Sequence, residues 1–371
     1  MANRENVQVV FISDEINPLL EIKDETGAVR QISLNQYQRS SRCAWVAKFD
    51  HANELEFRIL LESGDYVKPH DNEFFQTPLK SIWVQEQQLF NYEPAADVSL
   101  SQVKRVDEFT GRLSARPLYI YLPRGYESHS HREYPILYMH DGQNVFEAFV
   151  DDSYAGSWQA DVIADRLIEN GQMPECIIVG ISHGGEARIK EYLPPYSRLP
   201  IRNKRLNWIR GRANKTADYY IKDVAIYMQN NYRVKAGRQH VATCGSSMGG
   251  LFSLFLAWDY PDFAKNHAAM SPSIWTTINE NGKYETIERL RRLQPPDIRL
   301  WIDSGTVGTN GEGDDGQVEA VLASEILLEK GFVDGQNLQH YLDRGADHSE
   351  HAWSQRFDRV LRYLFPINGN K

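Results

Sequence analysis

A serine between two glycines is the first feature of this chain that could carry out covalent chemistry. In ATCGSSMGG, Gly245 and Gly249 stand two places before and two places after Ser247. This spacing is typical of a sharp turn where a strand ends at a serine and a helix begins, so that the hydroxyl projects above a sheet. The flanking segments HVATCGS and GGLFSLFLAW favour such a strand and helix. We predict that Ser247 is a nucleophile; the alternative is a tight turn without chemistry.

A nucleophilic serine needs a base, and the base needs an acid that holds it in one tautomer. In open α/β hydrolases these partners follow in the order serine, acid, histidine. His348, in ADHSEHAW, falls in a loop just before the last predicted helix, and we assign it as the base. His351 falls inside that helix, which favours a surface or packing role. A metal pair in HSEH is the weaker alternative, because the sequence adds no further ligand cluster with metal spacing.

The acid is expected in IDSGTVGTNGEGDDGQ, which follows the penultimate predicted strand. We choose Glu312, with Asp314 and Asp315 as the alternatives, because Asp303 falls in the strand end and comes early for the loop. The glycines of this segment do not form a phosphate-binding pattern. A loop that carries the acid is therefore the preferred interpretation.

Acyl transfer also needs N–H donors for a developing oxyanion. One is expected from the residue after the nucleophile, Met248, and the other from a loop that follows an earlier strand. The segment YPILYMHDGQNVF offers that loop. We assign the second donor to the N–H of Gln143, with Gly142 as the alternative.

Alternating strands and helices must position these residues. From residue 116 onward, apolar runs alternate with helical patterns, which favours an α/β fold with a mostly parallel sheet. Helices are predicted at 158–170, from about 216, directly after Ser247, at about 318–330, and after an N-cap at Ser349. We expect an α/β-hydrolase esterase domain over 116–371.

The first 95 residues have a different pattern. In LEFRILLE, apolar and polar residues alternate with period two, and similar short runs are separated by Asp, Asn, Gly and Pro. The pattern predicts a small β-sandwich over 1–95, like an immunoglobulin domain or a carbohydrate-binding module, followed by a linker over 96–115.

The composition narrows the class of protein. Apolar residues make up 42% of the 371 residues and charged residues 25%, as in a folded globular protein, and the net charge of −9 argues against nucleic acid or anionic membrane as a partner. The chain has no apolar run long enough to span a bilayer and begins without a secretory pattern. Three scattered cysteines fit reduced thiols. We expect a cytoplasmic protein.

The chain resembles the esterase D family of α/β hydrolases, which includes enterochelin esterases, feruloyl esterases and mycolyltransferases. The matching pieces are YLPRGY, YPILYMHDGQNVF, GSSMGGLFSL and ADHSEHAW. The resemblance implies that Ser247 is the nucleophile and His348 the base, and that the acid is a glutamate shortly after a Gly-Thr pair. Here the nearest one, Glu312, follows a second Gly-Thr pair. A β-domain before the esterase domain is similar to the layout of enterochelin esterases.

We therefore expect a serine carboxylester hydrolase that works through an acyl-enzyme without a cofactor or a metal. Its substrate would be a small-molecule ester, such as a siderophore ester or a sugar ester. The alternatives are an acyltransferase on the same triad and a non-catalytic carbohydrate- or ligand-binding protein on the same scaffold. The basic segment 197–215 would favour an anionic substrate if Arg205, Arg210 or Arg212 overhangs the pocket; the alternative is a solvated loop.

Overall fold

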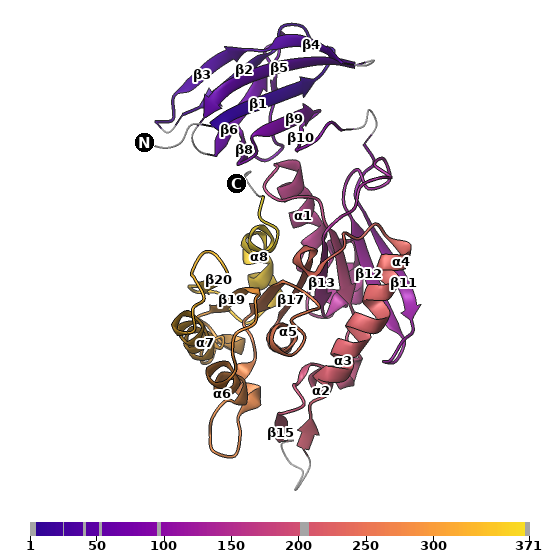
Figure 1. The fold of residues 1–371 in the computed structure, drawn as a ribbon, viewed down its shortest axis with the longest axis vertical. Coiled ribbons are helices and arrows are strands. Elements are labelled where there is room, and N and C mark those ends of the chain that lie inside the picture. Colours follow the sequence, from indigo (N-terminus) through magenta and orange to yellow (C-terminus); the bar gives the residue numbers. More distant parts are fainter. Residues whose placement is uncertain are drawn as a thin grey trace.

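The computed structural model describes residues 5–24, 26–39, 42–51, 54–94, 98–200 and 208–367. Its amino-terminal strands are β1 Glu5–Ile12, β2 Leu19–Lys23, β3 Val29–Ser33, β4 Asn35–Arg39, β5 Arg42–His51, β6 Leu55–Leu60, β7 Tyr66–Val67, β8 Phe75–Thr77, β9 Ser81–Gln85 and β10 Gln88–Phe90. They form one sheet in the order β10-β9-β1-β5-β4 and another in the order β3-β2-β6-β7, with β8 beside β6 (Figure 1).

These two sheets enclose one apolar core. The predicted alternation in β6 is present, since Leu55, Phe57 and Ile59 are buried and the residues between them are half-buried. The core also takes Val9 from β1 and Trp45 from β5 in the other sheet. Two sheets that share one core in this way are the arrangement that a β-sandwich requires.

The rest of the chain builds one mixed sheet. Its strands are β11 Gln102–Phe109, β12 Arg116–Leu122, β13 Ile136–His140, β14 Ile177–Ile181, β17 Val241–Ser246, β18 Asn266–Met270, β19 Arg299–Gly305 and β20 Leu338–Asp343. The eight strands lie in the order β11-β12-β14-β13-β17-β18-β19-β20. The strands from β14 to β20 in this order pair in parallel, and β11 and β12 are antiparallel additions at one edge.

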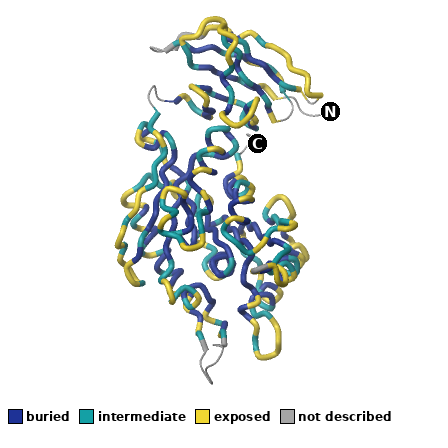
Figure 2. Tube along the Cα trace, turned by 180° about the vertical axis from the view of Figure 1, so that it is seen from behind, coloured by how far each residue is buried: buried dark blue, intermediate teal, exposed yellow. Residues whose placement is uncertain are grey.

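Helices cover both faces of this sheet. They are α1 Ala160–Glu169, α2 Arg188–Tyr192, α3 Ala213–Tyr219, α4 Ala225–Asn231, α5 Met248–Asp259, α6 Glu285–Arg292, α7 Gln317–Glu329 and α8 Glu350–Leu364, with a π-helical turn, η4 Tyr220–Val224, joining α3 to α4. Alternate residues of β13 enter different cores: Leu137 packs with α1 and α8, whereas Tyr138 packs with η4 and α5. In Figure 2, the segments in the middle of the large sheet are buried.

Most predicted elements of this half are present. The helix expected at 158–170 is α1, the one expected at 318–330 is α7, and Ser349 caps α8 by accepting a hydrogen bond from the Ala352 N–H at 3.2 Å. The stretch 96–115, predicted as a linker, contains β11, which forms the outer edge of the large sheet. Its polar sequence QVKRVDEF reflects this position, because one side of an edge strand faces solvent.

The amino-terminal sheets and the loops after the parallel strands lie at opposite ends of the large sheet. In Figure 1, β9 and β10 stand above the ends of the large sheet, near α1, while α2 and β15 lie at the far end. Hydrogen bonds join the two parts: Thr77 Oγ1 to the Gly171 carbonyl at 3.1 Å, and Tyr92 Oη to Glu175 Oε1 at 2.8 Å. Across the described ranges, no helix is both long and apolar enough to span a membrane.

Candidate active site

Ser247 occupies a strained turn between β17 and α5. Its backbone has φ 56° and ψ −121°, a conformation that a side chain disfavours, and it is the N-cap of α5. The neighbouring backbone holds the turn: the Ser247 N–H donates to the Met270 carbonyl at 3.0 Å, and the Ser247 carbonyl accepts from the Ser273 N–H at 2.9 Å. The side chain is half-buried, with Oγ 3.1 Å from Ser273 Oγ. The predicted strand, turn and helix are confirmed.

The first glycine of the motif is needed because β17 packs against His140 of β13. A β-carbon at Gly245 would lie 2.5 Å from His140 Cδ2, which real structures do not allow. The imidazole is fully buried, with hydrogen bonds from its two nitrogens to Tyr220 Oη and Ser253 Oγ, both at 3.0 Å. Burial lowers the pKa of His140 to about 3, so the ring is neutral and serves as packing beneath the turn.

His348 lies between β20 and α8, as predicted, and its Nδ1 donates to Asp315 Oδ1. Its side chain is 24% exposed, whereas the side chain of Asp315 is fully buried. The ring also packs edge-on against Trp353, with centroids 5.0 Å apart. A carboxylate that accepts from Nδ1 fixes the tautomer in which Nε2 is free to take a proton.

The structure corrects the preference for Glu312 as the neighbour of His348. Glu312 is exposed, and the carboxylate that contacts the histidine belongs to Asp315, one of the two alternatives. The other alternative, Asp314, is exposed and accepts a hydrogen bond at 3.0 Å from the N–H of Gln317, the first residue of α7. The path of the loop turns only Asp315 inward, and the spacing of the acidic residues does not reveal that path.

Asp315 is held by donors on its second oxygen. Oδ2 accepts from the Gly305 N–H at 2.6 Å and from the Ser271 hydroxyl. The buried guanidinium of Arg356 lies 3.8 Å from the same oxygen and pairs with Asp303 at 3.0 Å. These contacts fix the position of the carboxylate beside His348.

The segment after β18 connects the serine to the acid. Ser271 contacts Asp315, and Ser273, two residues on, contacts Ser247. Ser271 has φ 41° and also accepts from Trp353 Nε1 at 3.0 Å. Sequence reasoning missed this segment because β18, with the sequence NHAAM, lacks the apolar run that marks the other strands.

The loop after β13 begins with an ion pair between the buried Asp141 and the half-buried Arg188. Asp141 adopts φ 56° and ψ 51°, and its carboxylate accepts from Arg188 Nε at 2.7 Å and from a terminal nitrogen of the same guanidinium at 2.9 Å. A β-carbon at Gly142 would lie 2.4 Å from the backbone of Gly180, so only glycine allows the loop to pass this close to β14. The loop follows the strand where the order of the sheet reverses, a common place for binding sites in α/β folds.

Both predicted oxyanion donors lie in the first turn of a helical segment. Met248 is the first residue of α5, and Gln143 lies in the helical turn η1 Gly142–Asn144. The first N–H groups of a helix have no carbonyl partner within it, so such groups remain available to an anion. Gln143 Oε1 is buried and lacks a hydrogen-bond partner among the described residues.

Within the basic segment, β15 Arg198–Pro200 pairs antiparallel with β16 Trp208–Arg210. Arg210 and Arg212 are exposed. Arg205 lies outside the described residues. The proposed role of these cations in substrate choice stays a prediction.

Open sheets that present a serine on the turn after a central parallel strand, with a histidine after the last strand, are α/β hydrolases. The family model described as "Putative esterase" matches residues 114–364. The chain belongs to this family and is a carboxylic ester hydrolase.

Two curated relatives come from Bacillus subtilis (strain 168). Uncharacterized protein YbbA is 25% identical over 261 residues, which cover 67% of this chain and 92% of the relative. Ferri-bacillibactin esterase BesA is 28% identical over 149 residues, which cover 38% of this chain and 48% of BesA.

Solved structures share the fold. An IroE-like serine hydrolase from Shewanella oneidensis aligns with a TM-score of 0.53 at 19% identity, covering 71% of this chain and 79% of that chain. A ferulic acid esterase from Anaeromyces mucronatus aligns with a TM-score of 0.51 at 21% identity, covering 73% of this chain and 94% of that chain.

Proposed function

We propose that this esterase works through an acyl-enzyme on Ser247, with His348 as the base and Asp315 as the acid that orients it. The buried, hydrogen-bonded Asp315 beneath the partly exposed His348 carries the proposal. It gives the acid role to Asp315 in place of Glu312. The contacts of the segment 271–273 with both Asp315 and Ser247 support a common site.

In the first half-reaction, Ser247 Oγ attacks the ester carbonyl while His348 Nε2 takes the hydroxyl proton. The C–O bond to the alcohol then breaks, and the imidazolium returns the proton to the leaving alkoxide. In the second half, His348 takes a proton from water, whose oxygen attacks the acyl-enzyme, and Ser247 leaves with the proton that the histidine returns. The carboxylate of Asp315 orients His348 and stabilises the imidazolium in both halves.

The N–H groups of Met248 and Gln143 would hold the oxyanion. Each lies in the first turn of a helical segment, and the partial positive charge there favours a negatively charged oxygen. The glycine at 142 lets the loop approach β14, which supports a fixed position for the Gln143 N–H.

The substrate class is proposed from the relatives. BesA is named a ferri-bacillibactin esterase, and one structural neighbour is a ferulic acid esterase. We propose that this chain, like enterochelin esterases, prefers siderophore esters among small-molecule esters. A panel of siderophore, feruloyl and acetylated-sugar esters measures this preference, and equal kcat/KM values for all three would contradict it.

The mechanism is tested by exposing the protein to a fluorophosphonate and mapping the adduct by mass spectrometry. Phosphonylation should occur at Ser247 and disappear in the Ser247→Ala variant. Ser246→Ala is the matched control, because it removes the neighbouring hydroxyl and leaves the nucleophile in place. An adduct on Ser246, or labelling that survives in Ser247→Ala, would remove the proposed nucleophile.

A further inference from the structure

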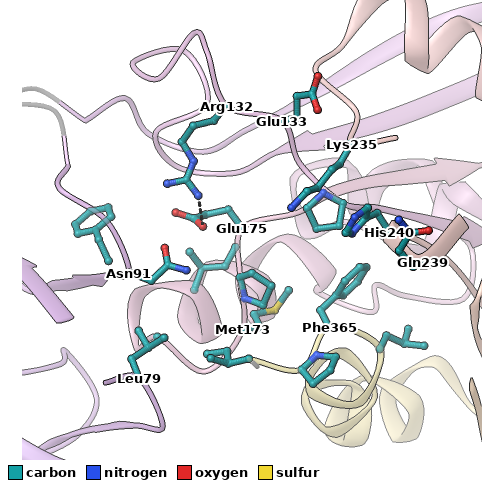
Figure 3. Close-up of a pocket in the computed structure, with 18 of the residues that line it drawn as sticks. Leu79, Asn91, Arg132, Glu133, Met173, Glu175, Lys235, Gln239, His240 and Phe365 are labelled. Carbon is teal, nitrogen blue, oxygen red and sulfur yellow. Dashed lines mark hydrogen bonds and ion pairs between the residues drawn. The ribbon is translucent and has the colours of Figure 1, made fainter. Parts of the chain in front are cut away.

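A cavity of about 670 Å³ lies between the amino-terminal sheets and the large sheet (Figure 3). On the large sheet it is lined by residues just before or at the start of parallel strands: Pro135, Glu175, His240, Lys265 and Arg299. On the other side it is lined by residues of β9, β10 and their flanks, including Leu79, Lys80 and Leu89. The catalytic residues follow the carboxyl ends of the strands, so this cavity lies at the opposite end of the sheet.

The cavity is rich in positive charge although the whole chain carries −9. Five lysine and arginine side chains line it, against two glutamates. Arg132 pairs with Glu175 at 3.2 Å, and Lys265 pairs with Asp297 outside the lining. Within the described ranges, Lys235 forms no ion pair, so its charge lacks a counter-ion. Arg299 forms no ion pair there either, but its Nε donates to the Gln336 carbonyl at 3.1 Å and its guanidinium lies 4.4 Å from the centre of the Tyr363 ring.

His240 adds a third group on the same side. Figure 3 shows Lys235 and His240 together, across the cavity from Asn91 and Leu79. Burial, and then the charge of Lys235, lower the pKa of His240. An anion bound between them would favour the protonated imidazole and offset the repulsion between the cations.

Apolar side chains form much of the remaining lining, beside the polar residues Ser81, Asn91, Gln239 and Asn266. Met173 follows α1, Phe365 follows α8, and both are buried. Further apolar side chains are Leu79, Leu89, Phe90, Ile168, Leu364 and Ile367. Ligand sites in proteins have this character: they are concave, mostly apolar, hold a few converging polar groups and often lie between domains.

We propose that this cavity binds an organic carboxylate with an aromatic or aliphatic body, with the carboxylate facing Lys235 and His240 and the body against Met173 and Phe365. The charges select an anion, and the apolar wall selects a body that an inorganic ion lacks. The site is separate from Ser247, and its existence does not depend on the proposed function.

Calorimetric titration of the full chain with 4-phenylbutyrate tests the proposal, with the uncharged 4-phenylbutyramide as the matched ligand. The acid should bind, and the amide should bind at least about tenfold more weakly, because a charge-assisted hydrogen bond contributes about a factor of ten or more. Equal affinities, or the absence of binding by the acid, would overturn the proposal.

Charge reversal locates the site. Lys235→Glu should weaken binding of 4-phenylbutyrate by about tenfold. Lys235→Arg should retain the affinity, and Lys48→Glu makes the same charge change at an exposed position of β5. An unchanged affinity in Lys235→Glu would place the anion elsewhere. An equal loss of affinity in Lys48→Glu would mean that the loss comes from the net charge of the protein, and both outcomes would contradict the proposal.

Nuclear magnetic resonance titration of His240 gives a second readout at the cavity. Saturating 4-phenylbutyrate should raise the pKa of His240, whereas 4-phenylbutyramide should leave it unchanged. An unmoved His240 alongside calorimetric binding would show that the acid occupies another site, including the pocket above Ser247, and would contradict the proposal.

Discussion

The turn that carries Ser247 and the loop that carries Asp315 reach the same site in different ways. The turn joins β17 directly to α5 and is fixed by two glycines and by hydrogen bonds to β18 and to the segment after it. The loop between β19 and α7 contains three carboxylates, of which two are exposed and one is buried. A short strand–turn–helix leaves one arrangement of the serine, whereas a longer loop can turn any of several neighbouring side chains inward.

This difference shows where the local sequence is sufficient to predict the position of a site residue. At the turn, a β-carbon at residue 245 would meet His140, so the glycine pattern reports a steric requirement directly. In the loop, Asp315 is selected by Ser271, Gly305 and Arg356, which come from three other parts of the chain. The following predictions test each side of this comparison, from the largest effect to the smallest.

Ser247→Ala tests the turn. Removal of the nucleophile should lower kcat for p-nitrophenyl acetate by about 10⁶-fold, because the remaining groups cannot replace covalent catalysis. Circular dichroism should show an unchanged fold. The neighbouring Ser246→Ala variant should keep most of the activity. A comparable loss in both variants would mean that the substitutions disturb the turn, and that the loss does not come from the missing Ser247 hydroxyl.

Asp315→Asn and Glu312→Gln test the loop. The first should lower kcat by about 10⁴-fold, because the amide no longer holds His348 in the required tautomer. The second should leave kcat within about twofold, because an exposed carboxylate away from the reacting groups contributes little. Steady-state kinetics on both variants decide the acid, and a larger loss in Glu312→Gln would restore the assignment made from the sequence.

Arg356→Met tests what holds the loop. The guanidinium side chain is 1% exposed and pairs with Asp303 at 3.0 Å, so its removal leaves buried carboxylates without their cation. The free energy of unfolding in urea should fall by about 3–5 kcal/mol. Arg359→Met, on the exposed side of α8, is the control and should change it by about 0.5 kcal/mol or less. Similar losses in both variants would argue against the buried network.

The buried histidines near the turn should make stability depend on pH. Burial lowers the pKa of His140 to about 3 and that of His267, which contacts Thr243 of β17, to about 4. Between these values and 6.5, the unfolded chain binds protons that the native chain does not. Each group should therefore reduce the free energy of unfolding by about 1.4 kcal/mol per pH unit as the pH falls well below 6.5. Above pH 6.5, the stabilisation by the neutral histidines is fully present.

Urea unfolding between pH 7 and pH 5 measures this slope. The His267→Asn variant lacks one of the two groups, so its slope near pH 5 should be smaller by about 1.4 kcal/mol per pH unit, whatever its stability at pH 7. An identical slope in the variant would mean that His267 is protonated in the native protein.

The sequence predicted the elements with strong patterns and missed those with weak ones. The run VATCGS predicted β17, and the N-cap Ser349 predicted the start of α8. In contrast, β11 is polar because it lies at the sheet edge, and β18 has the polar sequence NHAAM, in which Asn266 and His267 are buried with hydrogen-bond partners. Periodicity reports the surroundings of a strand, so it fails where those surroundings are unusual.

What the sequence alone determined is the family pattern, the alternation of strands and helices, and the position of Ser247 on its turn, because each depends on neighbouring residues. Only the tertiary structure placed Asp315 against His348 and the cationic side chains Lys235 and Arg299 around one cavity. Those contacts join residues far apart in the chain, and the loop path and the meeting of separate strand ends fix them. The spacing of residues along the sequence does not reveal the loop path or which strand ends meet.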